Sequence, residues 1–229
     1  MHRTLVSLIV VAGVCAFPDR ADAESTWFPM HIGNEWDYVD TGGAHEVVTF
    51  TRTMTLAGRE VFVLTYGPSV DNTGLENYWC AGPDGDVLLS GFFRSDDGFG
   101  WLYDPPIPLV DAPLSLGKTW SHATRVTLLP TMEDLGINVF GFQVYTAGLL
   151  SVPAGIYFAY GIGYSPPTLV VESARDLDAT GRRSSGPSVS DWWTDGLGRP
   201  QYNSFQLSAF SFPTPTRGAT WGKVKALYR

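Results

Sequence analysis

Alternation of side chains with a period of two is the feature that most restricts what this chain can fold into. Over His45–Met54, one side of an extended backbone carries Val48, Phe50, Arg52 and Met54, and the other carries Val47, Thr49, Thr51 and Thr53. Similar β-branched or aromatic runs recur at 61–66, 87–93, 120–129, 139–145, 156–160 and 169–172. No window after residue 23 sustains a helical stripe over three turns. The pattern predicts an all-β protein.

Short turn segments that contain glycine or proline divide these runs. They occur at 42–43, 57–58, 83–85, 97–98, 105–106, 166–167 and 196–198. Aromatic residues make up 14% of the chain and charged residues only 17%, which suits many short strands joined by tight turns. We expect a curved antiparallel sheet, arranged as a half-barrel or a sandwich.

Three short segments occur twice in the same order. The clearest pair is P-x-x-I-G-x-x-W at Pro29–Trp36 and P-x-x-L-G-x-x-W at Pro113–Trp120. Two weaker pairs match 57–62 with 154–158, and 78–82 with 192–196. They predict two pseudo-repeated β units, about 27–104 and 107–207, joined by an unpaired connection at Asp104–Pro108. Chance similarity in a chain rich in glycine and tryptophan is the alternative.

The first residues have the pattern of a secretory signal. An apolar run from Leu5 to Phe17 follows Arg3, and Ala21-Asp22-Ala23 supplies the small-x-small cleavage pattern. We expect residues 1–23 to be removed, leaving a β domain at 24–211 and a tail at 212–229, in the periplasm or outside the cell. Lipid attachment at Cys15 is the alternative, although Val14 fits poorly before a lipidated cysteine.

Three motifs resemble those of a broad set of uncharacterised exported bacterial β-sheet proteins. They are P-x-x-x-G-N-x-W-x-Y at Pro29–Tyr38, P-L-x-L-G-x-x-W at Pro113–Trp120 and V-P-A-G-x-[FY] at Val152–Tyr157. The resemblance implies a curved antiparallel sheet, loosely like periplasmic lipoprotein-carrier half-barrels. It carries no catalytic residues to this chain.

The charge balance restricts the partners. A net charge of −8 repels phosphate backbones and anionic lipid, so nucleic acid is excluded as a partner and a peripheral membrane role is disfavoured. Nothing after residue 23 is apolar enough to span a membrane. Cys80 is the one cysteine left after cleavage, and we expect it to be a buried, inert thiol. The oligomeric state cannot be predicted.

No catalytic residue is predicted. His31, His45 and His122 are isolated, and no G-x-S-x-G segment is present. Paired acids occur at 84/86, 96–97 and 133–134. They leave open an extracytoplasmic hydrolase acting on polysaccharide or cell-wall material. Acids beside glycine are otherwise usual in solvated turns.

The leading hypothesis is a non-enzymatic binding or surface-interaction protein that holds an apolar molecule or a glycan on a concave sheet. Its candidate ligand-binding residues are Trp79, Trp101, Trp192 and Trp193. Burial of these strand tryptophans in the core is the alternative at each position. A structural component of the cell envelope is the third hypothesis.

One segment matches the first half of a calcium loop. Asp176, Asp178 and Thr180 place oxygens at alternate positions before Gly181. The twelfth position is Pro187 in place of the usual glutamate. A polar surface loop is therefore the alternative to a calcium site, and no other cofactor is predicted.

The C-terminal tail combines aromatic and basic residues. A Pro/Thr segment precedes Trp221, Lys223, Lys225 and Tyr228. These four predict a detachable segment that docks on a partner. The alternative is a last element that packs on the parent domain.

Overall fold

The computed structural model describes residue 25 and residues 27–67, 74–169, 189–202 and 205–212. Within these ranges the backbone forms twelve strands and no helix. The strands are β1 (Glu35–Val39), β2 (His45–Leu56), β3 (Arg59–Tyr66), β4 (Leu75–Ala81), β5 (Val87–Arg94), β6 (Phe99–Val110), β7 (Thr119–Leu129), β8 (Glu133–Val152), β9 (Gly155–Leu169), β10 (Val189–Thr194), β11 (Gly198–Tyr202) and β12 (Phe205–Ser211).

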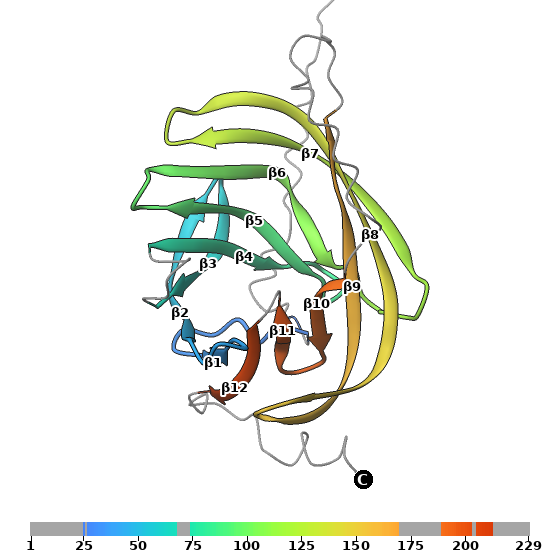
Figure 1. Ribbon diagram of the computed structural model, residues 1–229. Coiled ribbons are helices and arrows are strands. Elements are labelled where there is room, and N and C mark those ends of the chain that lie inside the picture. The colour runs from blue at the N-terminus through green and yellow to red at the C-terminus, as the bar shows by residue number, and fades with distance from the viewer. Residues whose placement is uncertain (1–24, 26, 68–73, 170–188, 203–204, 213–229) are drawn as a thin grey trace, which may run out of the picture.

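The strands form a closed antiparallel barrel in which neighbours in sequence are neighbours in space (Figure 1). The all-β antiparallel prediction is confirmed. The expected half-barrel or sandwich is corrected, because β1 pairs with β2 on one side and with β12 on the other. Glu35, for example, lies opposite Thr49 of β2 and Ser211 of β12. The curved sheet therefore continues until its two end strands meet, which leaves no free edge.

The connection expected at Asp104–Pro108 is part of a strand. β6 runs through it, with Ile107 opposite Leu89 and Pro108 opposite Leu88 of β5. The register with β5 shifts at two points along this pair. Prolines are tolerated here because such irregular places in a ladder require fewer backbone donors. The prediction of an unpaired linker is therefore wrong.

Aromatic side chains fill the centre of the barrel. Trp36 and Tyr38 of β1, Phe50 of β2 and Trp79 of β4 are at most 1% exposed. Alternation places them inside, while their sequence neighbours Asp37 and Thr49 lie nearer the surface. Trp36 donates its indole N–H to the Leu197 carbonyl at 2.8 Å, so β1 is also joined to the chain just before β11.

The segment before β1 enters this core. Phe28 is 1% exposed, and its ring lies 5.0 Å from that of Trp36, 5.3 Å from Trp79 and 5.8 Å from Trp193. The Ser25 hydroxyl donates to the Gly85 carbonyl at 2.9 Å. A Cβ at Gly198 would lie 2.5 Å from the Phe28 ring. Phe28 thus fills the space between the facing strands of the barrel, and glycine at position 198 makes room for its ring.

A second apolar cluster lies on the outer face of the sheet. Val61 and Val63 of β3 are fully buried there with Tyr78 and Cys80 of β4. Leu56, at the β2–β3 turn, packs against the same cluster. The turn end of this hairpin therefore covers part of the neighbouring strands, and both faces of the sheet are apolar here.

The two P-x-x-[IL]-G-x-x-W segments have matching backbone contacts. Gly33 donates its N–H to the Phe50 carbonyl at 2.7 Å, and Gly117 donates to the Val144 carbonyl at 2.9 Å. Both glycines adopt positive φ, 88° and 82°, which glycine accepts without steric cost. The first segment leads into β1 and the second into β7. The two-unit organisation remains a prediction, and this local likeness agrees with it.

Candidate functional site

The centre of the barrel contains a buried cation between two tryptophans. The Arg199 guanidinium of β11 lies 5.5 Å from the ring centroid of Trp79 and 5.6 Å from that of Trp193. Both tryptophans are 1% exposed. Cation–π attraction is strong in such desolvated surroundings. The candidate ligand residues Trp79 and Trp193 are thus packed against Arg199 and Phe28.

Polar groups from four strands surround Arg199. Arg199 donates to the Tyr66 hydroxyl at 3.3 Å and lies 3.7 Å from an Asp191 oxygen. Tyr66 also accepts a hydrogen bond from the Asn77 amide at 2.7 Å, and the Tyr38 hydroxyl donates to the Arg199 carbonyl at 2.8 Å. Burial raises the pKa of Asp191, and Arg199 acts in the opposite direction. The cluster ties four strands to one cation, so we assign it a structural role.

A second set of rings lines the inner face of the sheet over β5–β9, which lie next to one another in the barrel (Figure 1). We call this set the aromatic wall. Phe92, Phe99 and Trp101 form a triangle with centroid distances of 6.0, 5.5 and 5.7 Å. The series continues from Trp101 to Tyr103 at 6.5 Å and from Tyr103 to Phe140 of β8 at 6.0 Å.

Three further rings complete the wall on β7, β8 and β9. Trp120 lies opposite Phe142, which in turn lies opposite Tyr164. Trp120 and Phe142 stack at 5.2 Å with an interplanar angle of 11°, and the Phe142 and Tyr164 centroids are 6.5 Å apart. Cross-strand ring pairs of this kind stabilise a sheet. Register therefore brings together rings that are far apart in the sequence.

The aromatic wall differs from the central core in its exposure. Phe99 is 38% exposed and Tyr164 47% exposed, while Tyr103 and Phe142 are 6% exposed and join the wall to the core. Phe92, Trp101, Trp120 and Phe140 are half-buried. The wall is thus an apolar surface that solvent reaches at both ends.

Trp101 supplies a polar group within the wall. Its indole nitrogen is buried and has no hydrogen-bond acceptor among the described residues. Trp120 differs, because its indole N–H donates to the Pro108 carbonyl at 2.8 Å. Arg94, the last residue of β5, lies close to Asp97, with 3.8 Å between their charged atoms. Because the Trp101 nitrogen is buried, a ligand on the wall would meet mainly ring carbons.

The other predicted site residues lie elsewhere. Trp192 is half-buried on β10, opposite Gly161 of β9 and Gln201 of β11. The candidate calcium ligands Asp176, Asp178 and Thr180, and the candidate docking residues Trp221, Lys223, Lys225 and Tyr228, lie outside the described residues. So do the predicted signal peptide and most of the predicted tail. In the described part of the chain, no group of three or more His, Cys, Asp or Glu side chains is arranged to hold a metal ion.

The paired acids stabilise turns. In the β5–β6 turn, Asp97 accepts a hydrogen bond from the Phe99 N–H at 3.2 Å. In the turn that opens β8, Asp134 accepts one from the Gly136 N–H at 2.9 Å and pairs with Arg125. The Gly136 N–H, with help from Arg125, lowers the pKa of Asp134. An acid with a lowered pKa is unsuited to donating a proton at neutral pH.

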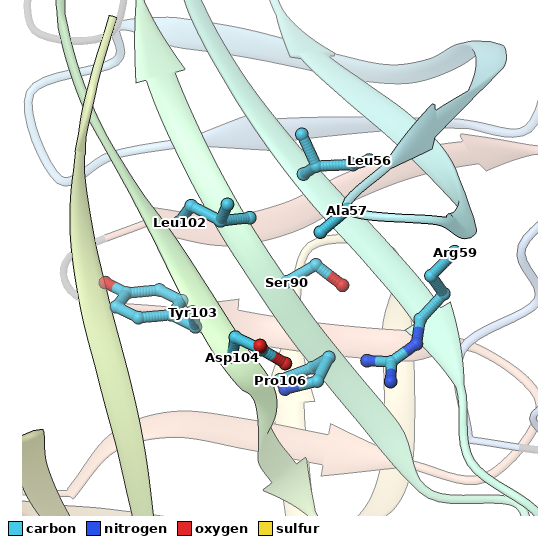
Figure 2. Close-up of a pocket in the computed structure, with 8 residues that line it drawn as sticks. All are labelled: Leu56, Ala57, Arg59, Ser90, Leu102, Tyr103, Asp104 and Pro106. Atoms are coloured by element: carbon cyan, nitrogen blue, oxygen red, sulfur yellow. The ribbon is translucent and has the colours of Figure 1, made fainter. Parts of the chain in front are cut away.

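A small hollow lies where the β2–β3 turn covers the outer face of β5 and β6 (Figure 2). Arg59 of β3 lies on one side of it, and Ser90 of β5 and Asp104 of β6 lie on the other. The space is about 20 Å³, which is room for a single water molecule. Cys80 is buried nearby, 3.4 Å from the Ser90 hydroxyl. This hollow is too small for an organic ligand.

Comparisons with known proteins give two structural likenesses and no family. No family model matches the chain, and no curated protein matches it. A crystal structure of a protein inferred to be exported, with a YmcC-like fold, from Bacteroides fragilis covers 81% of this chain and 99% of its own, at 13% identity and a TM-score of 0.38. A structure of a protein inferred to be a lipoprotein, from Parabacteroides distasonis, covers 80% and 97%, at 11% identity and a TM-score of 0.31. At these TM-scores neither likeness supports a conclusion about function.

Within the described ranges, no helix combines the length and the apolar composition that crossing a bilayer requires.

Proposed function

We propose that this is an exported, non-enzymatic binding protein that holds an apolar molecule against its aromatic wall. The observation that carries the proposal is the unbroken series of ring contacts from Phe92 through Trp101 to Phe140, on a surface that remains partly open to solvent. Rings held by paired strands lose little conformational freedom when a ligand binds, which favours affinity.

The orientation of the rings favours an apolar ligand over a glycan. Phe92, Phe99 and Trp101 meet at interplanar angles of 55° to 67°. In this arrangement each ring face is turned toward the edge of another ring, whereas sugar rings stack on open, flat faces. An apolar chain or a fused ring can pack against such mixed edges and faces.

The hydrolase hypothesis has less support. Asp97 and Asp134 accept hydrogen bonds from their own turns and contact Arg94 and Arg125. A glycosidase needs two acids facing one cleft, with one of them kept protonated. The structural-component hypothesis rests on the filled centre of the barrel, and it predicts that the wall binds nothing.

Binding of N-phenyl-1-naphthylamine, a neutral apolar fluorophore, to the mature chain tests the proposal. We expect saturable binding with enhanced fluorescence, and at least tenfold weaker affinity in Phe99→Ala and in Trp101→Ala. Phe99→Ala is the cleaner variant, because the Phe99 side chain is 38% exposed and its truncation should disturb the core less. Trp101→Phe keeps an aromatic ring at this position, so it should retain more of the affinity than Trp101→Ala.

Leu149→Ser serves as the matched control, because Leu149 is an exposed apolar residue away from the wall. It should bind the probe as the wild type does. Equal binding by Phe99→Ala and the wild type, or no binding by the wild type, would refute the proposal and favour a structural component.

Export is tested separately. After expression with the full leader in a bacterium, the mature N-terminus should be Glu24. Mass spectrometry that finds a lipid on Cys15 would replace secretion with membrane anchoring.

A further inference from the structure

The end of the β8–β9 hairpin exposes three large apolar side chains. Leu149 is 78% exposed, Ile156 66% and Phe158 53%. Leu149 lies directly opposite Phe158, and Ile156 lies opposite Ser151, two residues nearer the turn. Positions two apart on a strand share a face, so the three side chains lie together. We call them the apolar tip.

A fixed part of the fold presents the tip. On the opposite face of the hairpin, Val152 is 6% exposed and belongs to the core. The Ala154 N–H donates to the Leu207 carbonyl of β12 at 2.9 Å, and the Tyr157 hydroxyl donates to the Ala154 carbonyl at 3.0 Å. In Figure 1 the turn of this hairpin lies below β12. The tip therefore projects from an element anchored to the barrel.

Charge is absent from most of the hairpin. The sequence has no Asp, Glu, Lys, Arg or His between Asp134 and Glu172, in a chain whose net charge is −8. Glu133 and Asp134, the first two residues of β8, are the charged residues of the hairpin, and they lie at the end of β8 far from the turn. A hairpin with an exposed apolar end and no charge near its turn can insert that end into an apolar medium without burying an ion.

We propose that the apolar tip inserts into the interfacial layer of a lipid bilayer and holds the protein at a membrane surface. Three side chains offer far less than the roughly 800 Å² per partner of a stable protein interface. Insertion into lipid does not require so large an area. Tyr145, 37% exposed, lies farther along β8, and tyrosine is enriched where a membrane meets water.

The charge distribution also specifies the kind of membrane. The acidic remainder of the protein is repelled by anionic headgroups, whereas the uncharged tip is not. Binding to phosphatidylcholine vesicles should therefore exceed binding to vesicles that contain phosphatidylglycerol, and added salt should reduce the difference. This confines the earlier expectation against a membrane role to anionic surfaces.

Flotation of the mature chain with phosphatidylcholine vesicles tests the proposal. We expect Leu149→Ser/Phe158→Ser to lower the ratio of bound to free protein at least tenfold. Leu116→Ser/Met132→Ser is the matched control, since these residues are 65% and 61% exposed outside the hairpin, and it should float like the wild type. Both variants change exposed side chains, and unaltered circular dichroism should confirm that they fold.

An environment-sensitive dye locates the contact. Attached to Leu149→Cys, a nitrobenzoxadiazole group should shift to shorter wavelengths when vesicles are added, and attached to Leu116→Cys it should not. Failure of the wild type to float, or flotation of the Leu149/Phe158 variant equal to the wild type, would overturn the proposal. So would light scattering that shows a dimer abolished by that variant, because a second copy would then cover the tip. Probe binding at the aromatic wall is measured without lipid, so either proposal can fail alone.

Discussion

The rings of Trp79 and Trp193 lie 6.4 Å apart, inclined at 62°, in the centre of the barrel. The two residues hold the same place in the weakest of the three sequence pairs, 78–82 and 192–196. One belongs to β4 and the other to β10, and the Arg199 guanidinium lies within 5.6 Å of both ring centroids. Matching strands of the two predicted units therefore meet around one buried cation.

Removing that cation should destabilise the barrel severely. Arg199→Met leaves Asp191 buried without its partner, and we expect a loss of about 3–5 kcal/mol in urea unfolding. Arg52→Met is the control, because Arg52 forms its ion pair with Glu76 at the surface, where such a pair contributes about 0–1 kcal/mol. Adding Asp191→Asn to Arg199→Met should restore part of the loss. Equal effects of the two single variants would contradict the structural role of Arg199.

Truncation of Phe28 should leave a cavity in the core that the surrounding strands cannot close. For Phe28→Ala we expect the free energy of unfolding to fall by about 3–5 kcal/mol. Phe210→Ala removes the same ring from a position that is 40% exposed, and should cost about 1 kcal/mol or less. Calorimetry on both variants provides the measurement. A small effect at Phe28 would show that the barrel is stable without this ring.

Buried tyrosines should make the protein sensitive to alkali. Burial, together with Glu76, raises the pKa of Tyr78 from 10.0 to about 12, and burial raises those of Tyr38, Tyr66 and Tyr103. The folded state then keeps phenol protons that the unfolded chain has lost. Stability is therefore complete below pH 10 and declines as the pH rises from about 10 toward 12. Tyrosinate absorbance should rise together with unfolding, and full titration near pH 10 in a folded protein would contradict this.

Cys80 should be inert until the protein unfolds. Burial raises the pKa of its thiol, against a smaller opposing effect of the Ser90 hydroxyl, and the residue is 7% exposed. The thiolate is the reactive form, so Ellman's reagent should modify Cys80 only after denaturant is added. Ser151→Cys places a thiol at an exposed position of the β8–β9 hairpin and should react at once. Rapid modification of native Cys80 would show that the β2–β3 turn opens readily.

Alternation and turn residues were enough to predict most of the strands, but closure could not be predicted. Period two shows which side chains share a face, and Trp36 and Phe50 are inward as that rule requires. Closure depends on β1 pairing with β12, which is a contact between the two ends of the chain. No local pattern encodes that register. The linker prediction at Asp104–Pro108 was wrong for a related reason. Consecutive prolines indicate an unpaired segment unless the partner strand tolerates them, and the partner strand is not visible in the local sequence.

The sequence predicted that aromatic residues would form the candidate site, but it did not predict which of them line the partly open surface. Trp79 and Trp101 both lie in aromatic strands, yet one is 1% exposed and the other lines a partly open wall. Position along the barrel separates them, and a sequence pattern does not report it. No sequence pattern indicated that Arg199 would be buried, because an arginine between glycine and proline resembles a surface residue. The charge-free stretch between Asp134 and Glu172 was readable from the sequence and marks the hairpin.

The seam between β1 and β12 sets the order in which the molecule can be completed. A chain that emerges N-terminus first, from a ribosome or a translocation channel, presents β1 at once but has to wait for residues 205–211 before the seam can form. Phe28 likewise waits for Trp193. Until then the edge of β1 that faces β12 stays unpaired and Phe28 lacks part of its packing, and the entropy of closing so large a loop slows the last step. Such a delay suits the proposed export, because a chain that crosses a membrane through a translocation channel has to stay unfolded until its C-terminal end has passed.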